Sequence, residues 1–164
     1  MIRICLLLAF AFGFAGCSRH DHDHGHDHHG HAHTAPHGGT LVEIGEHQFN
    51  VELIFDATSG KLTAWLLDAH AEHFVRSAAP GMELSISTGG ELRSLTLLPV
   101  ANSATGETVG STSQFEASAD WLKDQPALTG VFVSLDFRGA VFSNVSFKVT
   151  AGVPAAVGGH NHSH

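Results

Sequence analysis

Tyrosine is absent from this chain, and cysteine occurs only twice, at Cys5 and Cys17. Phenol and thiol groups are common catalytic groups, and both are therefore scarce here. The sequence also contains no GxSxG nucleophile elbow, no glycine-rich phosphate loop and no HExxH metal pair. We therefore expect a protein that is not an enzyme.

The chain also contains few positively charged residues. The 164 residues contain 8 Lys and Arg against 16 Asp and Glu, a formal net charge of -8 with histidine neutral. The basic residues are scattered along the chain rather than clustered. Because nucleic acid and anionic lipid headgroups bind through concentrated positive charge, both are disfavoured as partners.

The first 16 residues are typical of an export signal. A single positive charge at Arg3 precedes an apolar run from Ile4 to Phe14, and the small pair Ala15-Gly16 then supplies a cleavage site. The run is too short for a comfortable membrane span. We therefore assign residues 1–16 to a signal peptide, and a plain secreted protein or an uncleaved anchor remain the alternatives.

The cysteine that follows makes this segment resemble a bacterial lipoprotein signal, although Phe14 stands where that motif usually has leucine. The resemblance implies that Cys17 is diacylated and anchors the protein in the cell envelope, facing the periplasm. In such lipoproteins a serine after the lipid cysteine usually permits sorting to the outer membrane. The resemblance therefore implies, through Ser18, an outer-membrane location if the cell has that membrane. Cys5 would leave with the signal peptide, and lipidation would convert the Cys17 thiol to a thioether. The mature chain would then have no thiol, so any metal must be held by imidazole, carboxylate or water.

A dense histidine tract follows the lipid cysteine. Between Arg19 and Thr34 lie eight histidines and three aspartates in fourteen residues, with no lysine or arginine. Imidazole is a common metal ligand, so we expect residues 17–36 to be a disordered metal-binding linker. Zinc is the expected metal, with Cu(II) or Ni as alternatives, and no organic cofactor is expected. The proposed ligands of the main tract are His20, His22, His24, His26, His28, His29, His31 and His33.

Further histidines occur outside the tract. A flexible tail, residues 152–164, carries His160, His162 and His164 as additional ligands. Within the region expected to fold, a second, ordered metal site is predicted at a strand end if the loops converge. The same residues could instead be exposed turn residues, and Asp68 could equally cap a turn. The candidate ligands of that ordered site are His37, Asp68, His70 and His73.

Residues 37–151 read as strand after strand. Apolar residues alternate with polar ones, and turn residues recur every eight to twelve positions, which predicts an all-β fold. We expect a single antiparallel β-sandwich or small barrel of about seven to eight strands. Hairpins are expected at 49–67, 84–98 and 131–149, a strand at 108–117, and one helical turn at 120–122 with Ser118 as its cap.

Three short segments carry a family resemblance: Pro36–Val42 as PHGGTLV, then Gln48–Phe55, then Leu62–Asp68 as LTAWLLD. They resemble the small exported domain of bacterial histidine-rich lipoproteins. They are also similar to segments near the N-terminus of periplasmic adaptor subunits of heavy-metal efflux pumps. The resemblance implies a β-rich periplasmic domain associated with metal handling. The chain lacks the long helical hairpin and lipoyl-like segments of a complete adaptor, so it would not bridge a pump alone.

Two functions follow from these observations. The first is a lipid-anchored periplasmic protein that captures, buffers or delivers a divalent transition metal through its histidine tract. The alternative is a non-catalytic interaction module of an envelope or metal-efflux assembly, in which the histidines are secondary. A metal transporter or an efflux adaptor is the expected protein partner.

Overall fold

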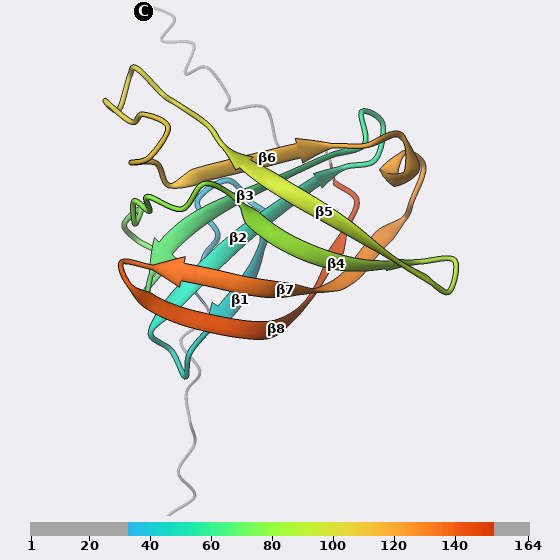
Figure 1. Ribbon diagram of the computed structural model, residues 1–164, viewed down its shortest axis with the longest axis horizontal. Coiled ribbons are helices and arrows are strands. Elements are labelled where there is room, and N and C mark those ends of the chain that lie inside the picture. Colours follow the sequence, from blue (N-terminus) through green and yellow to red (C-terminus); the bar gives the residue numbers. More distant parts are fainter. Residues whose placement is uncertain (1–32, 153–164) are drawn as a thin grey trace, which may run out of the picture. The chain divides into compact units, whose positions relative to one another are not determined.

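Eight antiparallel strands supply almost all of the regular structure. The computed structural model describes residues 33–152, and within that range the chain contains no α-helix. All eight strands fall inside the predicted 37–151 region, and the all-β prediction is confirmed (Figure 1). The strands are β1 (Thr40–Ile44), β2 (Phe49–Asp56), β3 (Lys61–Asp68), β4 (Met82–Thr88), β5 (Glu91–Pro99), β6 (Gln114–Ser118), β7 (Ala127–Phe137) and β8 (Ala140–Thr150).

The three predicted hairpins are all present. They join β2 to β3, β4 to β5, and β7 to β8. Two of their turns have two residues, Gly89-Gly90 and Arg138-Gly139, and all four of these residues have positive φ. This backbone geometry matches the right-handed twist of the flanking strands, which is why such turns are favoured in hairpins.

One strand carries the chain between two layers. The strand order in the sheet is β1-β2-β3-β6-β5-β4-β7-β8. Most of β5 pairs with β4, but its last residues, Leu98 and Pro99, pair with β6 instead. The sheet therefore continues from one layer into the other, and the two layers cross face to face (Figure 1). Sandwich and barrel describe the same object here: one sheet curled until it nearly closes.

The two edge strands approach each other without forming a ladder. Phe142 at the start of β8 packs on Phe49 and Phe137, with ring centroids 6.1 Å away in both cases. A side chain at Gly45, in the turn after β1, would collide with the Phe142 ring. At the other end of β8, Ala151 forms a parallel bridge with Phe55 of β2. Aromatic packing and this bridge therefore close the seam.

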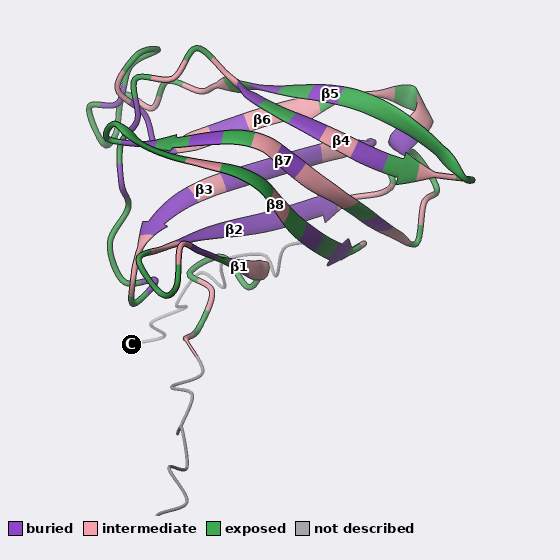
Figure 2. Ribbon diagram, turned by 60° about the horizontal axis from the view of Figure 1, so that its bottom comes forward, coloured by how far each residue is buried: buried purple, intermediate pink, exposed green. Residues whose placement is uncertain are grey.

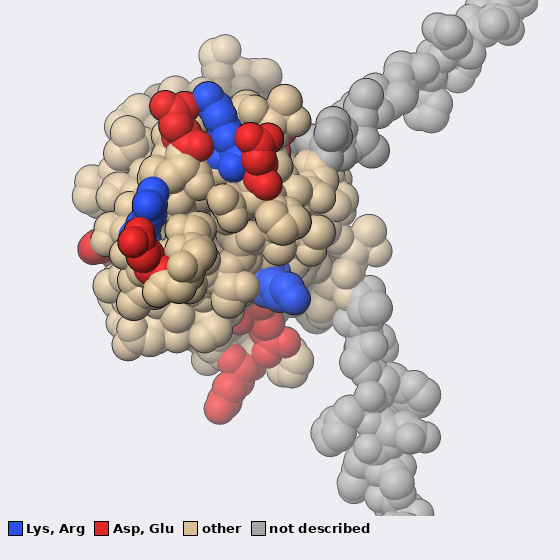
Figure 3. Space-filling view, turned by 90° about the vertical axis from the view of Figure 1, so that its right-hand side faces the viewer, with Lys and Arg blue, Asp and Glu red and all other residues tan. Residues whose placement is uncertain are grey.

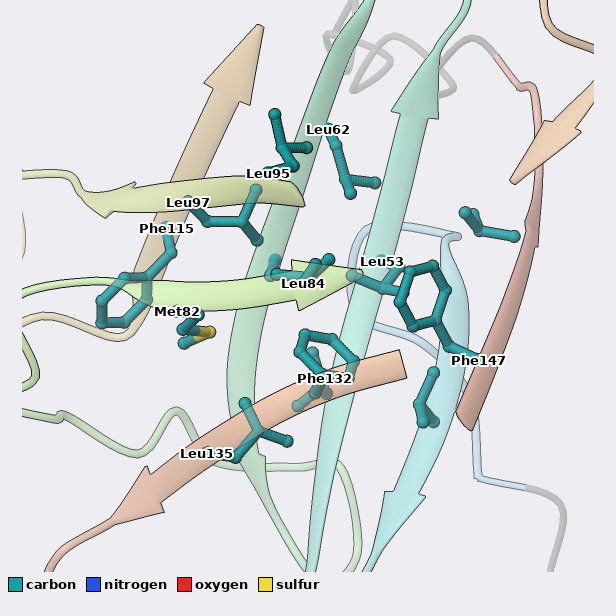
Figure 4. Close-up of a cluster of buried hydrophobic side chains, with 14 of the residues drawn as sticks. Leu53, Leu62, Met82, Leu84, Leu95, Leu97, Phe115, Phe132, Leu135 and Phe147 are labelled. Carbon is teal, nitrogen blue, oxygen red and sulfur yellow. The ribbon is translucent and has the colours of Figure 1, made fainter. Parts of the chain in front are cut away.

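The core lies between the two layers. Figure 4 shows side chains of β4 and β7, including Leu84 and Phe132, directed at those of β2 and β3, including Leu53. The buried members of this cluster come from residues 42–149. Figure 2 shows β2 and β3 buried along their length, whereas β8 is largely exposed. Residues 33–152 are thus sufficient to enclose a core.

Two local predictions were only partly right. The strand expected at 108–117 begins at Gln114, because Thr108 and Ser111 close a tight turn around Gly110, whose φ of +96° favours glycine. The helical turn is a 3-10 helix at Asp120–Leu122, but it follows Ala119 and has no side-chain cap. Ser118 is the last residue of β6 and does not cap it.

Replacing Phe142 with alanine should weaken the seam. The ring is half-buried against two other aromatic rings, so we expect a loss of about 2 kcal/mol in the free energy of unfolding. Urea denaturation measures it. The neighbouring Val141→Ala is the matched control, because Val141 is 62% exposed and should change stability by less than about 0.5 kcal/mol. Equal effects of the two substitutions would contradict this account of the closure.

Candidate functional site

The structure draws attention to a buried carboxylate on the outer face of β2. Strand alternation directs Val51, Leu53 and Phe55 into the core, so Glu52 points the other way, yet its exposure is 0%. The segment before β1 crosses directly over it. A β-carbon at Gly39 would lie 2.5 Å from the Leu53 carbonyl oxygen and 2.9 Å from Cγ of Glu52. Only glycine allows this close a crossing.

Three donors from the crossing segment satisfy the Glu52 carboxylate. Oε1 accepts the backbone N–H groups of His37, at 2.8 Å, and Gly39, at 2.9 Å. Oε2 lies 2.8 Å from Nδ1 of His37. An ionised carboxylate only accepts hydrogen bonds, so Nδ1 carries the proton in this pair. When the ring is neutral, its lone pair is then on Nε2, which is the arrangement found where a carboxylate accepts a hydrogen bond from a metal-binding histidine.

Two aromatic side chains also contact the imidazole ring of His37. It stacks on Trp65 with ring centroids 4.1 Å apart and an interplanar angle of 23°. Phe74 lies at 5.6 Å, tilted by 43°. Trp65 is the cross-strand partner of Glu52, so β2 and β3 together position the ring. The His37 side chain is still 37% exposed, so the ring is oriented without being sealed from solvent.

The last histidine of the tract also reaches the folded region. His33 lies beside His70 of the β3–β4 connection, with ring centroids 5.7 Å apart in an edge-on arrangement. The chain from His33 to Gly39 therefore passes from the end of β3 across the outer face of β2. We call this segment, residues 33–39, the junction.

The predicted four-residue metal site is not assembled, and this is a correction. Nδ1 of His37 is engaged by Glu52, while Asp68 Oδ2 lies 2.9 Å from Nδ1 of His73. Among residues 33–152, no group of three or more His, Cys, Asp or Glu side chains is placed to hold a metal ion. His70 is near His33 instead. The prediction failed because its residues do not converge: His37 is held at Glu52 and Trp65 on the outer face of β2 and β3, whereas Asp68 and His73 pair with each other in the turn after β3.

Asp68 caps a turn, as the alternative interpretation of this residue predicted. Its Oδ1 accepts the backbone N–H groups of Glu72 and His73, closing the turn after β3. Partial burial acts to raise its pKa, but hydrogen bonds from Glu72 and His73 outweigh burial, and the pKa lies below its usual value. His47, in the turn before β2, forms a similar pair with exposed Glu43, with 2.8 Å between Nδ1 and Oε2.

The remaining predicted residues lie outside the range that the structure describes. They are Cys17, His20, His22, His24, His26, His28, His29 and His31 at one end, and His160, His162 and His164 at the other. Within residues 33–152, no helix is both long enough and apolar enough to cross a membrane.

Sequence patterns did not reveal Glu52, Trp65 and Phe74 as site residues. In an alternating strand Glu52 reads as an ordinary solvent-facing position, and its burial depends on a segment 13 to 15 residues away. One feature could have pointed to Glu52: it lies between Asn50 and Ile54 in a strand whose central residues are all buried. A carboxylate in such a strand needs partners.

Surface charge is mixed. On the face shown in Figure 3, acidic and basic side chains lie next to one another and most of the surface carries neither. The ion pairs of the described residues include Lys61–Glu116 and Lys123–Asp120, at 2.8 and 2.6 Å. This face therefore offers no extended basic surface for a polyanion.

Comparisons with family models, with curated proteins and with solved structures found no match to this chain. The resemblance to histidine-rich lipoproteins and efflux adaptors therefore stays a prediction.

Glu52→Gln should reverse the tautomer of His37. The glutamine oxygen can still accept both backbone N–H groups, but its amide nitrogen would donate to Nδ1, which places the ring proton on Nε2. We expect a stability loss of about 1 kcal/mol, because each donor keeps a partner. Imidazole ¹⁵N shifts report the tautomer. Glu43→Gln is the matched control, and a His37 ring that kept its Nδ1 proton in Glu52→Gln would contradict the assignment.

Proposed function

We propose that this chain is an exported, lipid-anchored protein that binds divalent transition metal through its histidine tract and presents it on the outer face of a β-barrel. The observation that carries the proposal is the pairing of His37 with buried Glu52. The pair extends the ligand-rich sequence into the folded region with an imidazole whose Nε2 is free to coordinate. Carboxylate-oriented histidine is a recurrent ligand arrangement in metal proteins.

The chemistry of the tract supports the same proposal. Zinc takes about four ligands, so eight imidazoles suffice for ~2 ions. Cu(II) and Ni(II) compete well for nitrogen ligands, whereas Cu(I) is disfavoured because Met82 is the only sulfur ligand expected in the mature chain. Ordering the tract opposes binding, and anchoring its end at the junction reduces the length that must be ordered.

The predicted lipid at Cys17 gives this binding a place to act. A ligand set tethered between a membrane and a barrel would concentrate metal at the envelope surface for capture, buffering or delivery to a transporter. In this proposal the role of the barrel is to hold the tract in position, and not only to supply one metal ligand.

An interaction module remains the second candidate, favoured by apolar side chains on the surface. Leu92 is 75% exposed, Leu98 59% and Val109 69%, all on β5 or the loop that follows it. If this surface rather than the tract is what the cell uses, deleting residues 20–33 will leave the phenotype of the gene intact. If the tract is the functional element, that deletion will reproduce the phenotype of complete loss.

Calorimetric titration of Zn(II) into the chain beginning at Ser18 tests metal binding directly. We expect ~2 ions bound, because the tract supplies eight imidazoles. Deleting residues 20–33 should abolish most of this binding while leaving the unfolding transition unchanged, since the core uses residues 42–149. Undiminished binding after the deletion would refute the tract as the metal site.

Acid should release the metal. Ordinary imidazole has a pKa of about 6.5, and its protonated form cannot coordinate, so apparent affinity should fall steeply as pH drops from 7.5 to 5.5. The same titration, repeated across this range, provides the measurement. Affinity that stayed constant down to pH 5.5 would indicate carboxylate rather than imidazole ligands.

A further inference from the structure

Both histidine-rich ends of the chain join the barrel along one strand. The junction crosses β2 at Glu52, Leu53 and Ile54, as the contacts of Gly39 show. At the other end, Ala151 bridges Phe55, and the N–H of Gly152 donates to the Phe55 carbonyl at 3.0 Å. The two attachment points are therefore within a few residues of each other on β2, although more than a hundred residues separate them in sequence.

A groove lies on the outer face of the sheet, next to these attachment points in β2. It has a volume of about 300 Å³. One end, at Asp56, adjoins the place where Gly152 is fastened, and the other end is formed by Trp65, on which His37 stacks. The lining residues come from β2, β3 and β6 and are Ile54, Asp56, Lys61, Thr63, Trp65 and Glu116.

The lining suits an uncharged segment that carries a bound cation. Lys61 pairs with Glu116 at 2.8 Å, which leaves Asp56 as the unbalanced charge. The Ser59 hydroxyl and the Thr58 N–H, which donate to its carboxylate, lower the pKa of Asp56 and keep it ionised. Residues 153–164 read VPAAVGGHNHSH, with small apolar residues first and no Asp, Glu, Lys or Arg. Such residues can pack on Ile54 and Trp65, and bound metal would then meet a negative groove.

The available chain length is sufficient. His160 follows Gly152 by eight residues, which span up to ~27 Å when extended. The distance along β2 from Phe55 to the level of Glu52 is three residues, or roughly 10 Å. A segment already attached to the barrel also experiences a high effective concentration, in the millimolar range for short tethers, which a free partner does not.

We propose that the C-terminal segment, residues 153–164, lies in this groove when metal is bound, and that its histidines share the metal with Nε2 of His37. The metal then joins the two ends of the chain across β2. This inference rests on the proposed function, since it names further ligands for the same metal.

The test uses Zn(II) and the ¹⁵N-labelled chain beginning at Ser18, because the core lies within residues 42–149. Zn(II) should shift the backbone resonances of Lys61 and Thr63 in the groove and the ring nitrogens of His37. The triple variant H160Q/H162Q/H164Q should lose the groove shifts and bind zinc at His37 at least about tenfold more weakly. The matched control is His47→Gln, which removes a histidine with the same Nδ1–carboxylate distance of 2.8 Å and should behave as the unsubstituted chain.

The outcomes separate the two proposals. If Zn(II) binds but leaves the groove resonances unmoved, or moves them equally in the triple variant, the docking inference is overturned and the tract remains the metal site. If no zinc binds at all, the proposed function itself fails. Sedimentation at two protein concentrations completes the test: a monomer supports docking within one chain, and zinc-dependent dimers would overturn it in favour of bridging between copies.

Discussion

The buried carboxylate of Glu52 is the constraint on which the organisation of this molecule depends. Enclosing a carboxylate costs several kcal/mol unless its oxygens are fully hydrogen-bonded. Here two backbone N–H groups and one imidazole supply those bonds. Among the described residues, no buried side-chain nitrogen or oxygen lacks a partner. Satisfying Glu52 therefore requires the junction to stay in place, and the junction in turn fixes where the histidine tract leaves the barrel.

Local patterns predicted the hairpins because the information for a hairpin is local. Alternation in Phe49–Asp56 and the glycine pair at 89–90 specify strand and turn within a few residues. Strand order was not predictable in the same way, since periodicity says which face a residue occupies and nothing about the neighbouring strand. The transfer of Leu98 and Pro99 from β4 to β6 is one such case.

In the candidate site, too, contacts between residues close in sequence were predictable and contacts between distant segments were not. The role of Asp68 as a turn cap was predictable because its partners are four and five residues away. The role of Glu52 was not, because its burial comes from a segment that is distant in sequence and depends on the absence of a side chain at Gly39. The histidines were conspicuous, but the residue that orients His37 was hidden in an ordinary strand. Composition thus drew attention to the histidines, and only the fold showed what orients one of them.

The near-closure of the barrel has a consequence for behaviour at high density. An open sheet edge offers unpaired backbone groups to the edge of a neighbouring molecule, which is a common route to aggregation. In this fold β1 and β8 face each other across a seam filled by Phe142, so each edge screens the other. Molecules crowded side by side would therefore have little free edge through which to polymerise.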